Sequence, residues 1–99
     1  IPDSVVIAYI GRSNGAGPTL SAASTIPVIT VPATAHEYIE DVWSSLRTPS
    51  ATPVMTVLDP DNAVLAALHI LSARNPNIYA YVREMIEQRM RNTVYINVI

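Results

Sequence analysis

Cysteine, lysine and phenylalanine are absent from these 99 residues, and all six basic residues are arginine. The absence of cysteine excludes disulfide bonds and cysteine-ligated metal centres. No apolar run approaches the roughly 18 residues that a membrane-spanning helix needs. The formal charge of −2 also lacks the basic excess that nucleic acids and anionic membranes attract. We therefore expect neither a nucleic acid nor a membrane as partner.

The composition is that of one small folded domain. Apolar residues make up 49% of the chain and charged residues only 14%, which excludes a disordered polypeptide. The chain begins with Ile1-Pro2 rather than methionine, directly before an apolar run. We therefore expect a processed product, an engineered piece or a fragment of a longer polypeptide.

Three short apolar runs, at 4–10, 27–31 and 53–58, have the length and β-branching of strands buried on both faces. Helical patterns lie between and after them, and the predicted order is β-α-β-α-β-α-α. This order predicts an α/β fold with a three-layer arrangement around a parallel sheet. Three strands form a narrow sheet for this class, so the pattern favours half of a larger doubly wound domain. The helical patterns cover residues 19–24, 35–46, 63–73 and 76–90.

Local sequence signals mark the N-terminal starts of the last two predicted helices. Asp59-Pro60 and Asn75-Pro76 each place a capping side chain before a proline, as at a helix start. The alanine- and leucine-rich helix at 63–73 is predicted to be buried over most of its surface. The tail at 93–99 alternates apolar and polar residues, which predicts an edge strand or an extension that docks on a neighbour.

The most informative motif is the glycine-rich segment Gly11–Pro18, which follows the first strand. Its spacing, G-x-x-x-G-x-G, is neither the dinucleotide fingerprint nor the P-loop. A glycine-rich turn that leaves a buried strand is where open α/β sheets commonly bind ligands. Such a turn also occurs for purely structural reasons, so the motif needs support from the rest of the chain.

That support comes from a series of motifs in a fixed order. Gly-Arg-Ser-Asn-Gly at 11–15 is followed by Gly17-Pro18, by Ile-Pro-Val-Ile at 26–29, and by Asp-Val-Trp-Ser-Ser-Leu-Arg at 41–47. Pro49-Ser50, Thr-Val-Leu at 56–58 and Asn62-Ala63 come after them. Over residues 1–72 the chain resembles the C-terminal half of class II phosphoribosylaminoimidazole carboxylase. Residues 73–99 form a C-terminal helix and tail beyond this similarity.

The resemblance implies half of a flavodoxin-like domain that acts in purine biosynthesis. The family adds CO2 to aminoimidazole ribonucleotide (AIR), giving carboxyaminoimidazole ribonucleotide (CAIR), without ATP, biotin or another cofactor. The glycine loop would form the wall for CO2 and the imidazole ring, with backbone N–H groups facing the growing carboxylate charge. The substrate-binding residues implied are Gly11, Arg12, Ser13, Asn14, Gly15 and Gly17. Asp41, Ser44 and Ser45 match a segment that borders the site, partly across a subunit boundary.

The family's N-terminal half carries a Ser-x-Ser-Asp phosphate loop and a Ser-Ala-His segment with the catalytic histidine. Neither motif precedes Ile1, so we expect this chain to supply one wall of the site and to be inactive alone. The resemblance also implies a homo-octamer and a cytoplasmic location. The alternative hypothesis is a non-catalytic interaction module that retains the family's assembly surfaces.

The remaining candidates have two interpretations each. His36 follows Thr-Ala and superficially echoes the missing Ser-Ala-His, but an exposed residue in a helix's first turn is preferred. His36-Glu37 lacks the second histidine of a zinc-protease helix, so no metal site is expected. His69 is interpreted as a packing residue, and Trp43 as a core or interface residue rather than a ligand-stacking one. The apolar stripe from Ile78 to Met90 is interpreted as core or oligomer contact.

Overall fold

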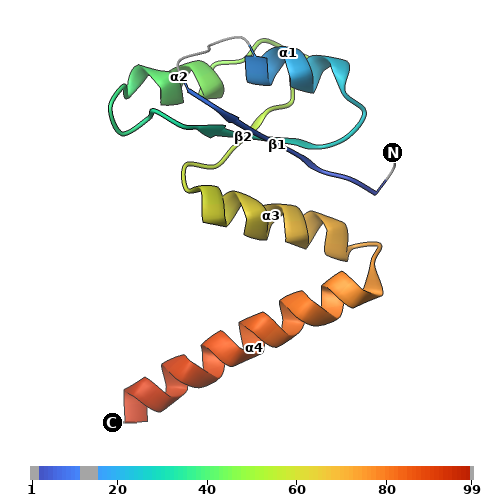
Figure 1. The fold of residues 1–99 in the computed structure, drawn as a ribbon, viewed down its shortest axis with the longest axis vertical. Helices are drawn as coiled ribbons and strands as arrows, with labels where there is room; N and C mark the ends of the chain where they lie inside the picture. Colours follow the sequence, from blue (N-terminus) through green and yellow to red (C-terminus); the bar gives the residue numbers. More distant parts are fainter. Residues whose placement is uncertain (1–2, 12–15, 99) are drawn as a thin grey trace. The chain divides into compact units, whose positions relative to one another are not determined.

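The computed structural model describes residues 3–11 and 16–98 of the chain. These residues form two compact units, one up to Ala67 and one from Leu68 onward, and each is described by itself. The first unit contains a sheet with flanking helices, and the second contains the end of one helix and a long helix after it (Figure 1).

The sheet of the first unit has three parallel strands in the order β1-β2-β3. Strand β1 spans Val6–Ile10, β2 spans Val28–Pro32 and β3 spans Met55–Thr56. The register pairs Val6 with Val28 and Ile29 with Met55. All five residues of β2 are buried, so the core lies along the central strand. The predicted parallel α/β fold is confirmed.

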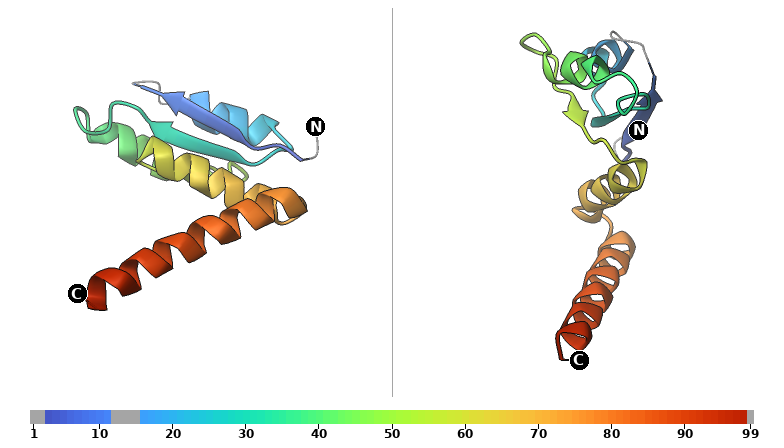
Figure 2. Two further views of the ribbon diagram at one scale, coloured as in Figure 1. Left: turned by 60° about the horizontal axis from the view of Figure 1, so that its bottom comes forward. Right: turned by 90° about the vertical axis from the view of Figure 1, so that its left-hand side faces the viewer.

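Helices cover both faces of this sheet. Helix α1 (Ala16–Ala23) and α2 (Glu40–Leu46) lie on one face, and the first turns of α3 (Pro60–Ser72) lie on the other (Figures 1 and 2). Ala63 on α3 is fully buried. On the opposite side, the buried Ser21 hydroxyl of α1 donates a hydrogen bond of 2.7 Å to the Pro53 carbonyl. This bond fixes α1 to the loop that leads into β3.

Two strand predictions need correction. The first strand was expected to be buried on both faces, yet Tyr9 is 63% exposed and Ile7 is exposed as well. Only β2 lies against β1, so one edge of β1 has no pairing strand among the described residues. The third strand is much shorter than the predicted 53–58, although the Val57 N–H continues the pairing with the Thr30 carbonyl at 3.0 Å.

Two helix predictions were also wrong, one in where the helix begins and the other in how much of its surface is buried. The pattern at 35–46 gives a helix only from Glu40, because the residues before it form a turn in which the Tyr38 N–H bonds the Thr34 carbonyl at 2.8 Å. Helix α3 is not buried over most of its surface: Val64 is exposed, while Ala63 and Ala67 are buried. An alanine-rich sequence permits close packing on every side but does not supply the neighbours.

In the second unit, α4 spans Pro76–Val98. Asn75 caps it, since its Oδ1 accepts hydrogen bonds from the N–H groups of Asn77 and Ile78 at 3.0 and 3.1 Å. On the exposed side, Arg83 donates to Glu87 at 2.9 Å, and this hydrogen bond together with the carboxylate charge raises the pKa of Arg83.

The tail was predicted as an edge strand or as an extension that docks on a neighbour. The strand alternative was wrong, because α4 continues through Val98. The Thr93 hydroxyl bonds back to the Arg89 carbonyl at 3.0 Å, a contact typical of a helical threonine. An established helix gains one backbone hydrogen bond for each residue added, and this gain outweighs a short alternating pattern.

Candidate functional site

The three parallel strands end at one edge of the sheet, and the predicted glycine loop begins there. Gly11 directly follows β1, and the turn at 33–37 directly follows β2. The Ala33 N–H donates to the Ile10 carbonyl at 3.0 Å and thereby joins the ends of the two strands. This carboxyl edge is the usual ligand-binding edge of an open α/β sheet.

Gly11 and Gly17 are needed for space rather than for unusual backbone angles. Neither has a positive φ angle. A Cβ atom on Gly11 would lie 3.0 Å from Thr34 Cγ2, and one on Gly17 would lie 2.9 Å from Thr30 Oγ1 and 3.0 Å from its Cγ2. Gly11 therefore contacts the turn after β2, while Gly17 allows α1 to approach β2 closely.

Thr30 is an unusual residue at this contact. Its side chain is buried at the centre of the sheet, and its hydroxyl has no hydrogen-bond partner in residues 3–11 and 16–98. A buried hydroxyl without a partner costs stability, so it calls for a specific explanation. The close approach of Gly17 leaves the hydroxyl against the backbone of α1, facing the helix start.

The predicted site residues fall into two groups on different elements. Gly11 and Gly17 lie at the two ends of the loop, whereas Arg12, Ser13, Asn14 and Gly15 lie outside the described residues. Asp41, Ser44 and Ser45 all belong to α2. The Ser44 hydroxyl donates to the Glu40 carbonyl at 2.9 Å, and the Ser45 carbonyl accepts a hydrogen bond from the Thr56 hydroxyl at 3.3 Å.

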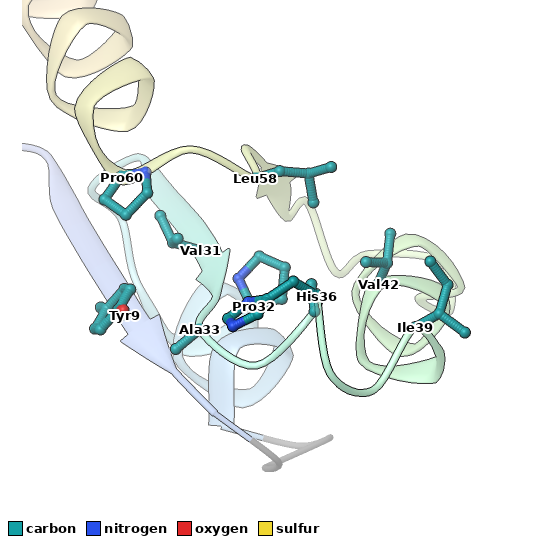
Figure 3. Close-up of a pocket in the computed structure, with 10 residues that line it drawn as sticks. Tyr9, Val31, Pro32, Ala33, His36, Ile39, Val42, Leu58 and Pro60 are labelled. Atoms are coloured by element: carbon teal, nitrogen blue, oxygen red, sulfur yellow. The ribbon is translucent and has the colours of Figure 1, made fainter.

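A groove of about 390 Å³ also opens at this edge of the sheet, and the sequence did not predict it. It runs over the end of β2 toward α2, with His36 from the turn between them (Figure 3). His36 was expected to be an exposed residue in the first turn of a helix. Its side chain is exposed, as expected, but the helix placement was wrong, because α2 begins only at Glu40. The position of Ala33–His36 directly after a buried strand was the signal that could have identified this lining.

The other singled-out side chains are exposed. His69 is not a packing residue, since it is exposed on α3. Trp43 is 52% exposed and stacks beneath the Arg47 guanidinium, 5.5 Å from the ring centroid, so it is not a core residue of this chain. Within the part of the chain that the structure describes, no three metal-binding side chains cluster, and no helix is both long and apolar enough to cross a membrane.

Comparison with known proteins decides the family. The model of the AIR carboxylase family matches residues 2–92, almost the whole chain. The chain belongs to the AIR carboxylase family. The match continues past Ser72 and includes most of α4, so the long helix lies within the family's sequence pattern.

Several AIR carboxylase relatives are considerably longer than this chain. The probable multifunctional protein ADE2 of Caenorhabditis elegans is 41% identical over 94% of this chain, but the match covers 21% of that protein. The human bifunctional phosphoribosylaminoimidazole carboxylase/phosphoribosylaminoimidazole succinocarboxamide synthetase is 38% identical over 84% of the chain and 20% of its own length. The phosphoribosylaminoimidazole carboxylase of Archaeoglobus fulgidus is 31% identical over 90% of the chain and 50% of its own length. The chain thus spans about a fifth of the animal relatives and half of the archaeal one.

Proposed function

We propose that this chain is the C-terminal half of an AIR carboxylase domain and acts in purine biosynthesis. In the reaction, C4 of the imidazole ring of AIR attacks the carbon of CO2, and a C=O electron pair moves onto oxygen as the new C–C bond forms. The ring proton at C4 then leaves to a base, which gives CAIR. Family membership over residues 2–92 carries this proposal, and the names of the relatives agree with it.

The segment from Gly11 to Gly17 forms the CO2 and imidazole subsite. It leaves the sheet at the carboxyl edge and leads into α1, whose first N–H groups have no partner within the helix. Backbone donors and the side chains of Arg12, Ser13 and Asn14 stabilise the carboxylate charge that develops on the former CO2 oxygens. No ATP, metal or other cofactor takes part in this scheme.

The residues that bind the phosphate of AIR and the base that removes the ring proton lie outside these 99 residues. Two observations support a further neighbour: one edge of β1 has no pairing strand among the residues that the structure describes, and Ile7 and Tyr9 are exposed on its face. An apolar parallel strand is normally covered on both faces and rarely stands at an open edge. The length of the relatives agrees with such a further half. We place the assembled enzyme in the cytoplasm.

The protein acts as a homo-oligomer, an octamer as in its family, whose subunits meet at α2. Trp43 and Leu46 of α2 and Ile39, which immediately precedes the helix, are spaced for one side of it, and Ile39, Trp43 and Leu46 are 67%, 52% and 57% exposed. Such a row of large apolar side chains is typical of an interface rather than of a solvated helix. In this arrangement Asp41, Ser44 and Ser45 border the site of a neighbouring subunit.

The same exposed row favours a second candidate, a non-catalytic interaction module. Both candidates predict self-association, so activity has to separate them. If the complete polypeptide that carries this chain self-associates through α2 but does not consume AIR, the result supports the interaction module.

The test of the carboxylase is the rate of AIR consumption with CO2 by the polypeptide that carries this chain. Asn14→Ala removes one polar group from the proposed subsite, and its expected effect is a fall in kcat of roughly 100-fold, as for other donors to a developing oxyanion. Asn77→Ala on α4 is the matched control and should leave kcat unchanged. An Asn14→Ala variant with full activity would contradict the assigned role of the loop.

A further inference from the structure

The glycine-rich segment is held in position by the two elements that it connects. At one end Gly11 follows β1, whose register is fixed by its pairing with β2. At the other end the segment leads into α1, which begins at Ala16. Because a strand paired in a sheet has little freedom, the attachment of α1 decides where the second end of the segment lies.

The described residues of α1 give the helix little apolar packing. Among those whose burial is described, only Gly17 and Ser21 are buried, and Leu20 is 41% exposed. Gly17 and Ser21 are four residues apart, so they lie on the same face of the helix. Gly17 has no side chain, and its contact with Thr30 permits a close approach without directing it. The directional attachment of this face therefore comes from Ser21.

The hydrogen bond of Ser21 connects α1 to a distant segment. Its hydroxyl donates to the Pro53 carbonyl at 2.7 Å, across 32 positions of the sequence. Pro53 lies just before β3, which begins at Met55. A cleft of about 390 Å³ opens beside this bond, and Ser21, Pro53 and Met55 are among the residues that line it. The bond thus joins the helix to the sheet at a place where packing is incomplete.

The carbonyl that accepts this bond belongs to a loop with its own internal structure. The Thr48 hydroxyl donates to the Thr52 carbonyl at 3.1 Å. Between them Ala51 has a φ angle of 65°, which is unfavourable for a residue other than glycine. A conformation of this kind persists only where the surrounding structure determines it. The loop therefore offers Ser21 an acceptor in a defined position.

We propose that Ser21 is a positioning residue of the CO2 and imidazole subsite. Through its bond to Pro53 it fixes α1 on the sheet, and α1 fixes the C-terminal end of the glycine-rich segment. Donors to a developing charge are effective only when they are already in place, and a misplacement of about 1 Å can lower a rate roughly 100-fold. The effect on catalysis rests on the proposed function, whereas the anchoring of the segment can be measured without turnover.

The first experiment uses the glycines as probes. The chain has three, Gly11, Gly15 and Gly17, and all of them lie in the glycine-rich segment, so 15N-glycine labelling of the 99-residue chain reports on this segment alone. Ser21→Val should shift the amide signals of Gly15 and Gly17. Ser21→Thr has the same shape but keeps the hydroxyl, so it should leave these signals near their original positions. The cleft beside Ser21 has room for the added methyl group of both variants.

Ser24→Ala is the matched control for these variants. The Ser24 hydroxyl donates to the Ile26 carbonyl and accepts from the Ile26 N–H, both at 3.0 Å, which is a local contact after the end of α1. Its removal should leave the glycine signals and the activity unchanged.

The second experiment measures kcat and KM for AIR with CO2 in the polypeptide that carries this chain. Ser21→Val should lower kcat on the order of 10- to 100-fold, and KM for AIR should change by less than about twofold, because the residues proposed to bind its phosphate lie elsewhere. Ser21→Thr should retain most of the activity. Each kcat is expressed per folded molecule, determined by far-UV circular dichroism, so that partial unfolding alone does not lower it.

Unchanged Gly15 and Gly17 signals in Ser21→Val, or equal shifts in the valine and threonine variants, would overturn the anchoring by the hydroxyl. Shifted signals with an unchanged kcat would overturn the positioning role. If the signals shift as expected but the parent polypeptide does not carboxylate AIR, the proposed function fails and the anchoring of the segment by Ser21 is supported.

Discussion

Replacing Gly17 by alanine tests the packing that brings the glycine loop onto the sheet. Alanine is allowed at this backbone position because φ is not positive, and it is a better helix residue than glycine by roughly 0.5–1 kcal/mol. The added methyl group would nevertheless lie 2.9 Å from Thr30 Oγ1 and 3.0 Å from Thr30 Cγ2. Both atoms belong to a buried side chain, so they have little room to move.

The steric effect should exceed the gain in helix propensity. Overpacking of a buried contact costs about 1–3 kcal/mol. After the helix gain is subtracted, Gly17→Ala should lower the free energy of unfolding by roughly 0–2.5 kcal/mol, with a central value of about 1 kcal/mol. Thr30→Ala deletes the two atoms that clash, so the double variant should recover the loss, with a coupling energy on the order of 1–2 kcal/mol.

The assay is urea unfolding followed by far-UV circular dichroism and by the fluorescence of Trp43, the single tryptophan. Gly11→Ala is the control, since its methyl group would meet Thr34 and not Thr30. It should show no coupling with Thr30→Ala. A stabilising Gly17→Ala, or additivity of the two substitutions to within about 0.3 kcal/mol, would refute the proposed contact.

Three further predictions concern stability and helix extent. Thr30→Val replaces a hydroxyl that has no partner among the described residues by a methyl group of similar size, and it should raise the free energy of unfolding by about 1 kcal/mol; a loss of stability would show that the hydroxyl is bonded. Asn75→Ala removes two capping hydrogen bonds and should cost about 1 kcal/mol in urea unfolding, whereas Asn62→Ala should cost less. Residues 93–98 should have positive 13Cα secondary shifts, and negative shifts would restore the strand prediction.

Local chemistry made part of this fold predictable from the sequence. The caps at Asp59 and Asn75 depend on hydrogen bonds within a few residues, and the Asp61 N–H indeed bonds Asp59 Oδ1 at 2.9 Å. The apolar run that became β2 is buried at every position, as its composition indicated. The order of strands and helices followed from these short-range signals.

The errors occurred where distant neighbours decide the outcome. Tyr9 lies within an apolar run typical of a buried strand, yet it is exposed, because its burial depends on what lies beside β1. The alternation of apolar and polar residues in the tail indicated a strand, but the tail instead continues the helix that precedes it. The groove around His36 was not foreseen, because it arises from the meeting of segments that are distant in the sequence. The roles of the loop residues and of the α2 serines remain predictions.

The central claim is that this chain carries the CO2 subsite of an AIR carboxylase. The most direct test supplies AIR and 13C-labelled bicarbonate, without ATP, to the polypeptide that contains this chain, and follows the product by 13C NMR. We predict a labelled carboxylate on C4 of the imidazole ring, formed at a rate that Asn14→Ala lowers. Absence of the labelled product, or formation only when ATP is added, would contradict the account.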